Sequence, residues 1–340
     1  MTTLSRFLLA AVLVAFISGA VAAETTHGEE KLVWPYGAAN PRIKFVRAFA
    51  SADDIGISKG FFARVSDFLF GASAARIIRP MAVATAGGAV FVADPGARGV
   101  HRFDVAGGDY ALLTATDNAP LPSPVGLARG ANGDVYVTDA KLAQVFVIRR
   151  GAKAAQALPL QATLKQPTGI AFDPVSGRLY VTDTAQHQVL VFAPGGALEA
   201  RIGTRGNGDG EFNFPTYLWR TPQGHLFVTD TLNFRIQHFD EHGRFIGKFG
   251  RQGDGTGEAA RPKGVALDGY GHIYVVDALF HALQIFDDAG RLLLPVGEQG
   301  QGRGEFWLPT GIFIDDDNTI YVADSYNRRV QVLRYIGGAS

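Results

Sequence analysis

The feature that most constrains the fold of this chain is a short apolar run that ends in aspartate and recurs six times. The runs read VFVAD, VYVTD, LYVTD, LFVTD, IYVVD and IYVAD, and they end at Asp94, Asp139, Asp183, Asp230, Asp277 and Asp324. Successive aspartates are 44 to 47 residues apart. A constant period of this length is typical of repeat proteins, in which one unit alone cannot bury its apolar face.

Each repeat unit has the composition of several short strands joined by turns. A proline opens each unit, at Pro80, Pro124, Pro167, Pro215, Pro262 and Pro309. In the fourth unit the strand-like runs are TYLW, HLFVT, RIQHF and RFIGKFG, separated by residues that favour turns. Four strands in about 40 to 50 residues are the signature of one propeller blade. The sequence therefore predicts an all-β protein, a six-bladed β-propeller of four-stranded blades over residues 80–336.

The ends of the chain indicate how the ring closes. The last unit stops at VQVLRYIGG and lacks its fourth strand. Residues 41–49, PRIKFVRAF, resemble the fourth strand RFIGKFG of another unit. We expect this N-terminal strand to complete the last blade, because closure of the ring removes an exposed sheet edge.

Three glycine-rich stretches precede the last three blades. They begin at Gly206, Gly253 and Gly300, and read GNGDGEFNFP, GDGTGEAARP and GQGRGEFWLP. Alternating glycines would suit a loop that turns its N–H groups toward a phosphate. However, the stretches recur at the same 47-residue period as the strands. That repetition favours structural loops between blades over nucleotide sites.

With these motifs in place, the chain resembles the NHL-repeat family of six-bladed propellers, in a form typical of exported bacterial proteins. The resemblance rests on YVTDTAQHQVLVF at 180–192, YVADSYNRRVQVL at 321–333 and the GxGxGEFxxP loops. It covers about residues 80–335, and the first two units lack the glycine-rich loop. Propellers of this family often serve as platforms for recognition of proteins or ligands, so the resemblance implies a binding role.

The family also contains peptide-amidating lyases, which bind zinc through histidines placed directly after blade-opening prolines. The corresponding residues here are Met81, Val125, Thr168, Thr216, Lys263 and Thr310. Because none of them is histidine, the resemblance does not extend to that activity.

The N-terminal residues 1–23 are typical of a secretory signal peptide. Arg6 precedes the short apolar run 7–17, and Ala20-Val21-Ala22 provides small residues for cleavage. We therefore expect an exported protein, periplasmic or extracellular, with an uncleaved membrane anchor as the alternative. No second apolar run is long enough to cross a membrane.

Composition narrows the classes of partner. Lys and Arg together number 32, as do Asp and Glu, so the net charge is zero. This balance argues against a nucleic-acid partner and against electrostatic docking to anionic lipid. The chain has no cysteine, which excludes disulfides and thiolate metal sites.

A segment between the closing strand and the first blade, within residues 24–79, has helical periodicity. At about 59–70 the residues that share one face are Phe61, Phe62, Val65, Phe68 and Leu69. The sequence predicts a short helical insertion here. It either packs on the propeller or docks the protein to a partner or a membrane surface, as in a structural module of an envelope complex.

Candidate binding residues are found where the repeat varies. In an up-and-down blade, the turns after the six aspartates and the glycine-rich loops lie at one mouth of the channel. The fourth residues after the aspartates are Arg98, Ala143, His187, Phe234, His281 and Arg328. In the fourth blade Tyr217 replaces a glycine and Trp219 replaces a smaller residue, so these aromatics either fill the channel or form one wall of a pocket.

We therefore predict a site for a protein or a small-molecule ligand formed by Arg98, His187, Tyr217, Phe234, His281 and Arg328. The alternative is a lyase-like or lactonase-like enzyme with His187 and His281 as metal ligands or acid–base groups. No GxSxG, HExxH or P-loop motif is present, and no cofactor is predicted. The acidic run 315–318 lacks the spacing of a calcium loop and is interpreted as an ordinary turn.

Overall fold

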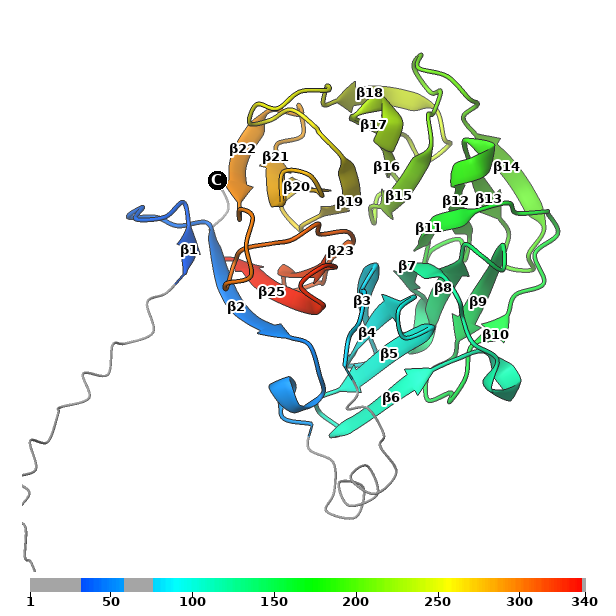
Figure 1. Cartoon of the computed structure of the whole chain (residues 1–340). Coiled ribbons are helices and arrows are strands. Elements are labelled where there is room, and N and C mark those ends of the chain that lie inside the picture. The colour runs from blue at the N-terminus through cyan, green and yellow to red at the C-terminus, as the bar shows by residue number, and fades with distance from the viewer. Residues whose placement is uncertain (1–31, 58–75, 338–340) are drawn as a thin grey trace, which may run out of the picture. The chain divides into compact units, whose positions relative to one another are not determined.

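Each repeat unit folds into one antiparallel sheet, and six such sheets surround a common axis (Figure 1). The structure is a computed structural model that describes residues 32–57 and 76–337. The predicted signal peptide (1–23) and helical insertion (59–70) lie outside the described residues. The prediction of six blades built on four-stranded sheets is confirmed.

The first three blades take their strands from consecutive segments of the chain. Blade one contains β3 (Ala82–Ala86), β4 (Ala89–Asp94), β5 (Gly99–Asp104) and β6 (Asp109–Leu113). Blade two contains β7 (Pro124–Arg129), β8 (Val135–Asp139), β9 (Gln144–Ile148) and β10 (Gln156–Ala157). Blade three contains β11 (Pro167–Phe172), β12 (Leu179–Asp183), β13 (Gln188–Phe192) and β14 (Leu198–Ile202).

The next two blades repeat this order. Blade four contains β15 (Pro215–Arg220), β16 (Leu226–Asp230), β17 (Arg235–Phe239) and β18 (Phe245–Phe249). Blade five contains β19 (Pro262–Leu267), β20 (Ile273–Asp277), β21 (Ala282–Phe286) and β22 (Leu292–Val296). The helical elements of the described residues are short 3-10 turns: Asp53–Ile55, Thr116–Asn118, Ala131–Gly133, Thr184–Gln186 and Thr231–Asn233.

Blade six is assembled from both ends of the chain. Its C-terminal strands are β23 (Ile312–Ile314), β24 (Thr319–Asp324) and β25 (Arg329–Tyr335). The N-terminal β2 (Ile43–Phe49) pairs antiparallel with β25, from Ile43 opposite Tyr335 to Phe49 opposite Val330 (Figure 1). The predicted closing strand is therefore confirmed. A further strand that the sequence did not indicate, β1 (Val33–Trp34), pairs with the outer side of β2.

Burial along the strands follows their place in the blade. Every residue of the second strands β12, β16 and β20 is buried, because these strands have neighbours on both sides. The outermost strands β18 and β22 alternate between exposed and less exposed residues, as expected where one face of a strand meets water.

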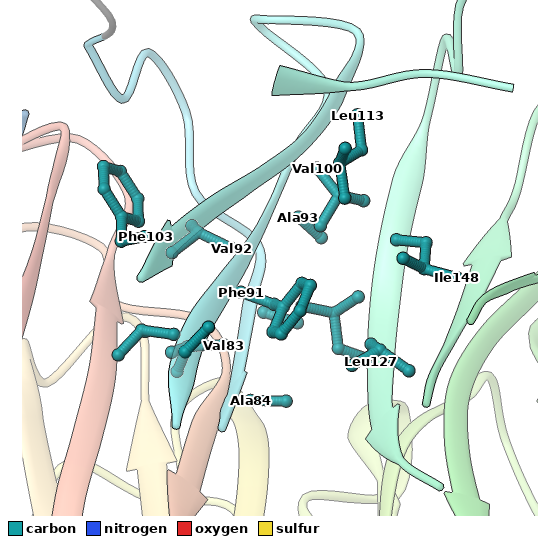
Figure 2. Close-up of a cluster of buried hydrophobic side chains, with 14 of the residues drawn as sticks. Val83, Ala84, Phe91, Val92, Ala93, Val100, Phe103, Leu113, Leu127 and Ile148 are labelled. Carbon is teal, nitrogen blue, oxygen red and sulfur yellow. The ribbon is translucent and has the colours of Figure 1, made fainter. Parts of the chain in front are cut away.

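The apolar core lies between neighbouring blades. In Figure 2, Phe91 of β4 points from blade one toward Leu127 and Ile148 of blade two. Further clusters join blades two and three, three and four, four and five, and five and six. Each blade is thus stabilised mainly by burying its faces against the next blade, as in other repeat proteins.

Close approach of the innermost strands explains the glycines after the blade-opening prolines. A Cβ atom on Gly169 would lie 2.5 Å from the carbonyl oxygen of Thr216 and 2.9 Å from Cα of Tyr217 in the next blade. A side chain at this position of blade three would push the neighbouring blades apart, and the equivalent residue is Gly or Ala in every blade except the fourth, where it is Tyr217.

Candidate functional site

The six repeated aspartates are structural. All six are fully buried. Asp183 accepts hydrogen bonds from the backbone N–H groups of Lys165 (2.6 Å) and Gln166 (3.1 Å), in the linker that opens its own blade, and from Gln186 in the following turn. Equivalent bonds join Asp94 to Ile78 and Asp277 to Ala260. These carboxylates hold the linkers and turns together and are not available to a ligand.

The glycine-rich loops are closed by hydrogen bonds to the same blades. Arg235 donates to the carbonyl oxygens of Asn207, Gly208 and Glu211. Gln237 accepts from Gly210 N–H and donates to the carbonyl of Glu211. The carboxylate of Glu211 accepts from Gly208 N–H. Because the loop already uses these groups internally, it is a structural connection, as the repetition in the sequence predicted.

The six residues at the fourth position after each aspartate share a left-handed backbone. Their φ angles lie between +54° and +57°, in Arg98, Ala143, His187, Phe234, His281 and Arg328. This conformation ends the turn between the second and third strands, and it costs free energy in any residue other than glycine. Arg98 and Arg328 are exposed, whereas His187 is buried.

The two histidines of this set tie one blade to the next. His187 Nδ1 accepts a hydrogen bond from the backbone N–H of Phe214 at 3.1 Å, and His281 Nδ1 accepts from that of Leu308 at 3.0 Å. Both acceptors therefore hold the linker just before a blade-opening proline. In each imidazole, Nε2 is then the only ring nitrogen left for another interaction.

Tyr217 crosses the propeller axis. Its hydroxyl donates to the carbonyl oxygen of Met81 in blade one at 2.8 Å, although the two residues are 136 positions apart. Its side chain is 9% exposed, and burial raises the pKa of its hydroxyl well above the usual range. Tyr217 thus closes the channel near the end at which the first strand of each blade begins. On the side of Tyr217 that faces the other end of the channel, it lines a cavity.

The cavity occupies the axis between Tyr217 and the turns that join the first and second strands. Its volume is about 820 Å³, within the range of sites for small organic molecules. The aromatic part of its wall includes Trp219 and Phe313, whose rings make an edge contact with centroids 5.8 Å apart. Of the six predicted binding residues, only Tyr217 lines it; the other five lie in the turns at the opposite end.

Two ion pairs stand at the rim of the cavity. Arg220 pairs with Asp173 at 2.7 Å, and both side chains are less than 10% exposed. Burial would raise the pKa of Asp173, but hydrogen bonds from Ser176 and Arg220 hold it below its usual value. Arg129 of blade two makes a two-point contact with Asp316 of blade six, at 2.9 and 2.6 Å. This second pair joins the two neighbours of blade one, so it spans blade one at the rim.

Further carboxylates face the same rim. Asp268 is buried and accepts from the Tyr274 hydroxyl at 2.9 Å. Partial burial, reinforced by the neighbouring Asp317, raises the pKa of Asp315 to about 6. The rim therefore offers fixed positive and negative groups together with one carboxyl, Asp315, whose pKa is raised. Among residues 32–57 and 76–337, no three His, Asp or Glu side chains are placed to share a metal ion.

The fold and cavity can be set beside known proteins. A family model described as a 6-bladed beta-propeller matches residues 158–219, 217–278 and 268–335, together more than half of the chain. The chain belongs to this family. As a six-bladed propeller it shares its architecture with many solved structures of very different function.

Three solved structures illustrate that range. An auxiliary nutrient binding protein from Bacteroides thetaiotaomicron is 14% identical, with a TM-score of 0.61, and the match covers 77% of this chain and 70% of that one. Virginiamycin B lyase from Staphylococcus aureus is also 14% identical, with a TM-score of 0.57 and coverage of 86% and 100%. A nidogen/laminin complex gives 19% identity, a TM-score of 0.55 and coverage of 74% and 87%. At these identities the likeness concerns the propeller fold alone.

Sequence reasoning missed most of the cavity rim of this propeller. It singled out Trp219 and Tyr217, which do line the cavity, because they replace small residues of the repeat. It interpreted residues 315–318 only as a turn. They do form a turn, with Asn318 N–H donating to Asp315, but Asp315, Asp316 and Asn318 also line the cavity. The available signal was that this turn is the most acidic of the six equivalent turns.

Proposed function

We propose that this propeller binds a small organic ligand in its axial cavity, entered from the side of the turns between the first and second strands. The observation that supports this proposal is the cavity itself. It combines an aromatic wall at Trp219 and Phe313 with a rim of opposite charges at Arg129, Asp315 and Asp316. Concave sites of this kind, mostly apolar with a few fixed polar groups, are typical of small-molecule binding.

The strands around the axis favour a ligand with several hydrogen-bonding groups. In every blade the first strand pairs on one side only, with the second strand. Near the closed end, groups of its other edge bond to a neighbouring blade, as Gly264 N–H does to the Thr310 carbonyl. Nearer the mouth, this edge pairs with no strand and lies beside the cavity. The proposed ligand therefore has an apolar body that stacks on Trp219 and polar groups that hydrogen-bond to these strand edges.

The comparisons lend this proposal general support. The solved structures of similar fold include an auxiliary nutrient binding protein and a lyase that, by its name, acts on virginiamycin B. We also keep as proposals the NHL-repeat assignment, carried by the YVTD and YVAD units, and export of the chain, carried by residues 1–23. We do not extend the proposal to catalysis by His187 and His281, because their Nδ1 atoms already accept backbone hydrogen bonds.

A binding screen that reports on one tryptophan tests the proposal. The chain has three tryptophans, so Trp34→Phe with Trp307→Phe leaves Trp219 as the single reporter. Free amino acids, mono- and disaccharides, nucleosides and aromatic acids are added, and Tm and Trp219 emission are recorded. We expect a compound that raises Tm and changes the emission with one site per chain, and that no longer raises Tm in a Trp219→Leu variant.

The matched control is Trp307→Leu, which removes an indole at the opposite end of the channel. It should bind the same compound with unchanged affinity. If every compound that raises Tm binds the Trp219→Leu variant as well as the parent protein, the cavity is not the site. If none of these classes binds, a role in binding them is excluded.

A further inference from the structure

The cavity is lined by more acidic than basic side chains. In the described part of the chain its charged lining residues are Arg129, Arg220, Asp268, Asp315 and Asp316. Both arginines already have a carboxylate partner, since Arg129 pairs with Asp316 and Arg220 pairs with Asp173. Asp268 and Asp315 form no ion pair with a lysine or arginine of residues 32–57 and 76–337. The lining therefore carries negative charge that no basic side chain neutralises.

The two carboxylates without a basic partner belong to neighbouring turns. Asp268 lies in the turn between β19 and β20 of blade five, and Asp315 lies in the turn between β23 and β24 of blade six. The turns are joined by a hydrogen bond of 2.8 Å from Gly269 N–H to Asn318 Oδ1. The uncompensated charge is thus concentrated on one side of the cavity mouth.

Hydrogen bonds satisfy these carboxylates without neutralising them. Asp268 accepts from the Tyr274 hydroxyl at 2.9 Å and from His272 Nδ1 at 2.7 Å, a bond that a neutral imidazole can donate. Asp315 accepts from Thr319 N–H at 2.9 Å. The Asp268 side chain is fully buried, so it acts on the cavity through its electric field. Asp315 is partly exposed and can contact a ligand directly.

Aromatic rings lie on the same side of the cavity. Trp219 belongs to β15 of blade four and Phe313 to β23 of blade six, on either side of blade five (Figure 1). Tyr270, which is 49% exposed, also lines the cavity from blade five. Cζ of Arg129 lies over the Phe313 ring, 5.7 Å from its centroid, so one cation already rests against these rings. Aromatic faces beside carboxylates are surroundings that favour an organic ammonium ion.

We propose that the ligand of this cavity is an organic ammonium ion, with its hydrocarbon part against Trp219 and its positive charge beside Asp315. This inference rests on the proposed function and narrows it to one class of ligand. The ring gives an apolar contact that tolerates a cation, and the carboxylate gives the cation its counter-ion. Both contacts are available without breaking an ion pair of the rim.

Ligands of other charge fit the lining less well. A carboxylate or phosphate would have to compete with Asp316 for Arg129 or with Asp173 for Arg220, because the lining residues include no lysine in the described part of the chain. A neutral ligand would cover the Asp315 carboxylate without giving it a counter-ion, which is unfavourable. A bare metal ion would gain nothing from the aromatic wall, so the expected cation is organic.

Two matched sets of compounds test the class of ligand. Phenethylamine, phenethyl alcohol and hydrocinnamate share an aromatic body and differ in charge; hexylamine, hexanol and hexanoate repeat the comparison with an aliphatic body. Each is titrated at neutral pH into the chain that keeps Trp219 as its single tryptophan, and the emission is recorded. We expect each amine to bind about tenfold more tightly than its alcohol, with the carboxylate weakest. High salt should weaken binding of the amines only.

Substitutions at the rim separate charge from shape. Asp315→Asn keeps an oxygen for Thr319 N–H and should weaken amine binding about fivefold, with alcohol binding unchanged. Arg129→Gln leaves Asp316 without its partner and should strengthen amine binding about threefold, whereas a site for anions would be weakened. The matched control is Asp288→Asn, which removes an exposed carboxylate outside the lining, in the β21–β22 turn at the same end of the propeller. It should bind amines like the parent chain, and circular dichroism verifies that all variants fold.

The outcomes distinguish this inference from the proposed function. If an alcohol or a carboxylate changes Trp219 emission at the same concentration as its amine, the cavity is a ligand site but its ligand is not a cation. If Asp315→Asn affects amine binding no more than Asp288→Asn does, the charge at Asp315 is not recognised and the inference is wrong. If none of the six compounds binds, the inference is also wrong, and the broader screen with Trp219→Leu decides the proposed function by itself.

Discussion

Asp230 and Asp139 occupy the same position in blades four and two, but only Asp230 neutralises a buried guanidinium. Asp230 accepts from Arg235 Nε at 2.8 Å, and the Arg235 side chain is 7% exposed. It also accepts from Asn213 N–H and from the Asn233 and Gln237 amides. Asp139 accepts only from backbone N–H groups, those of Ser123, Lys141 and Leu142. Substitution of each aspartate by asparagine therefore compares a lost acceptor with a lost counter-ion.

The expected free energies of unfolding differ between the two variants. Asp139→Asn should lower stability by about 1 to 3 kcal/mol, the range for leaving a buried hydrogen-bonding group without its partner. Asp230→Asn should lower it by about 3 to 5 kcal/mol, because the Arg235 charge is left buried without compensation. The difference of about 2 kcal/mol corresponds to a Tm lower by about 3 °C for a folded unit of this size.

Urea unfolding followed by circular dichroism measures both variants on the same scale. A double-mutant cycle with Arg235→Met isolates the charge: in the Asp230→Asn background this substitution should recover part of the lost stability. Equal losses for Asp139→Asn and Asp230→Asn would refute the reasoning. So would a cycle in which the Arg235→Met and Asp230→Asn effects simply add.

Gly169→Ala should lower stability by about 2 to 3 kcal/mol, because its Cβ would meet the backbone of blade four, whereas Gly195→Ala, with no atom within 4 Å of its Cβ, should be neutral in the same urea assay. Burial, with help from Arg261, lowers the pKa of Lys263 to about 8. Between pH 8 and about pH 10.5 the unfolded chain therefore binds more protons than the folded chain. The free energy of unfolding of the parent should rise across that window by up to about 3 kcal/mol relative to that of Lys263→Met. A difference between the two proteins that stays constant with pH would contradict this. The pKa of Asp315 is raised to about 6, so the folded state holds its proton longer and stability should fall as pH rises from about 4 to 6, by roughly 1 kcal/mol after allowance for solvent screening. Asp315→Asn should flatten that part of the profile, and an unchanged profile would show that another group titrates.

The architecture could be predicted from the sequence because the residues that determine it recur at a constant spacing. The spacing of Asp94 to Asp324 gave the number of blades, and the likeness of residues 41–49 to a fourth strand gave the closure. Such features depend on local strand and turn residues, and each repeat contains these residues again.

The functional site was harder to predict because it depends on contacts between distant blades. Nothing in the spacing of Tyr217 shows that its hydroxyl reaches Met81 across the axis, although that contact determines which end of the cavity is closed. Likewise, His187 has the chemistry of a metal ligand or base, yet its Nδ1 is used by the linker at Phe214.

The pairing of β2 with β25 has a consequence for how the chain folds. During synthesis β2 is made before every other blade strand and β25 after all of them, so the ring cannot close until β25 has been made. Until then two sheet edges are open, one at each end of an incomplete circle, and both are competent to pair with another chain. Slow ring closure, crowding during synthesis or loss of the last strand would therefore favour exchange of β2 between molecules. In that way a strand used for closure becomes a strand used for assembly.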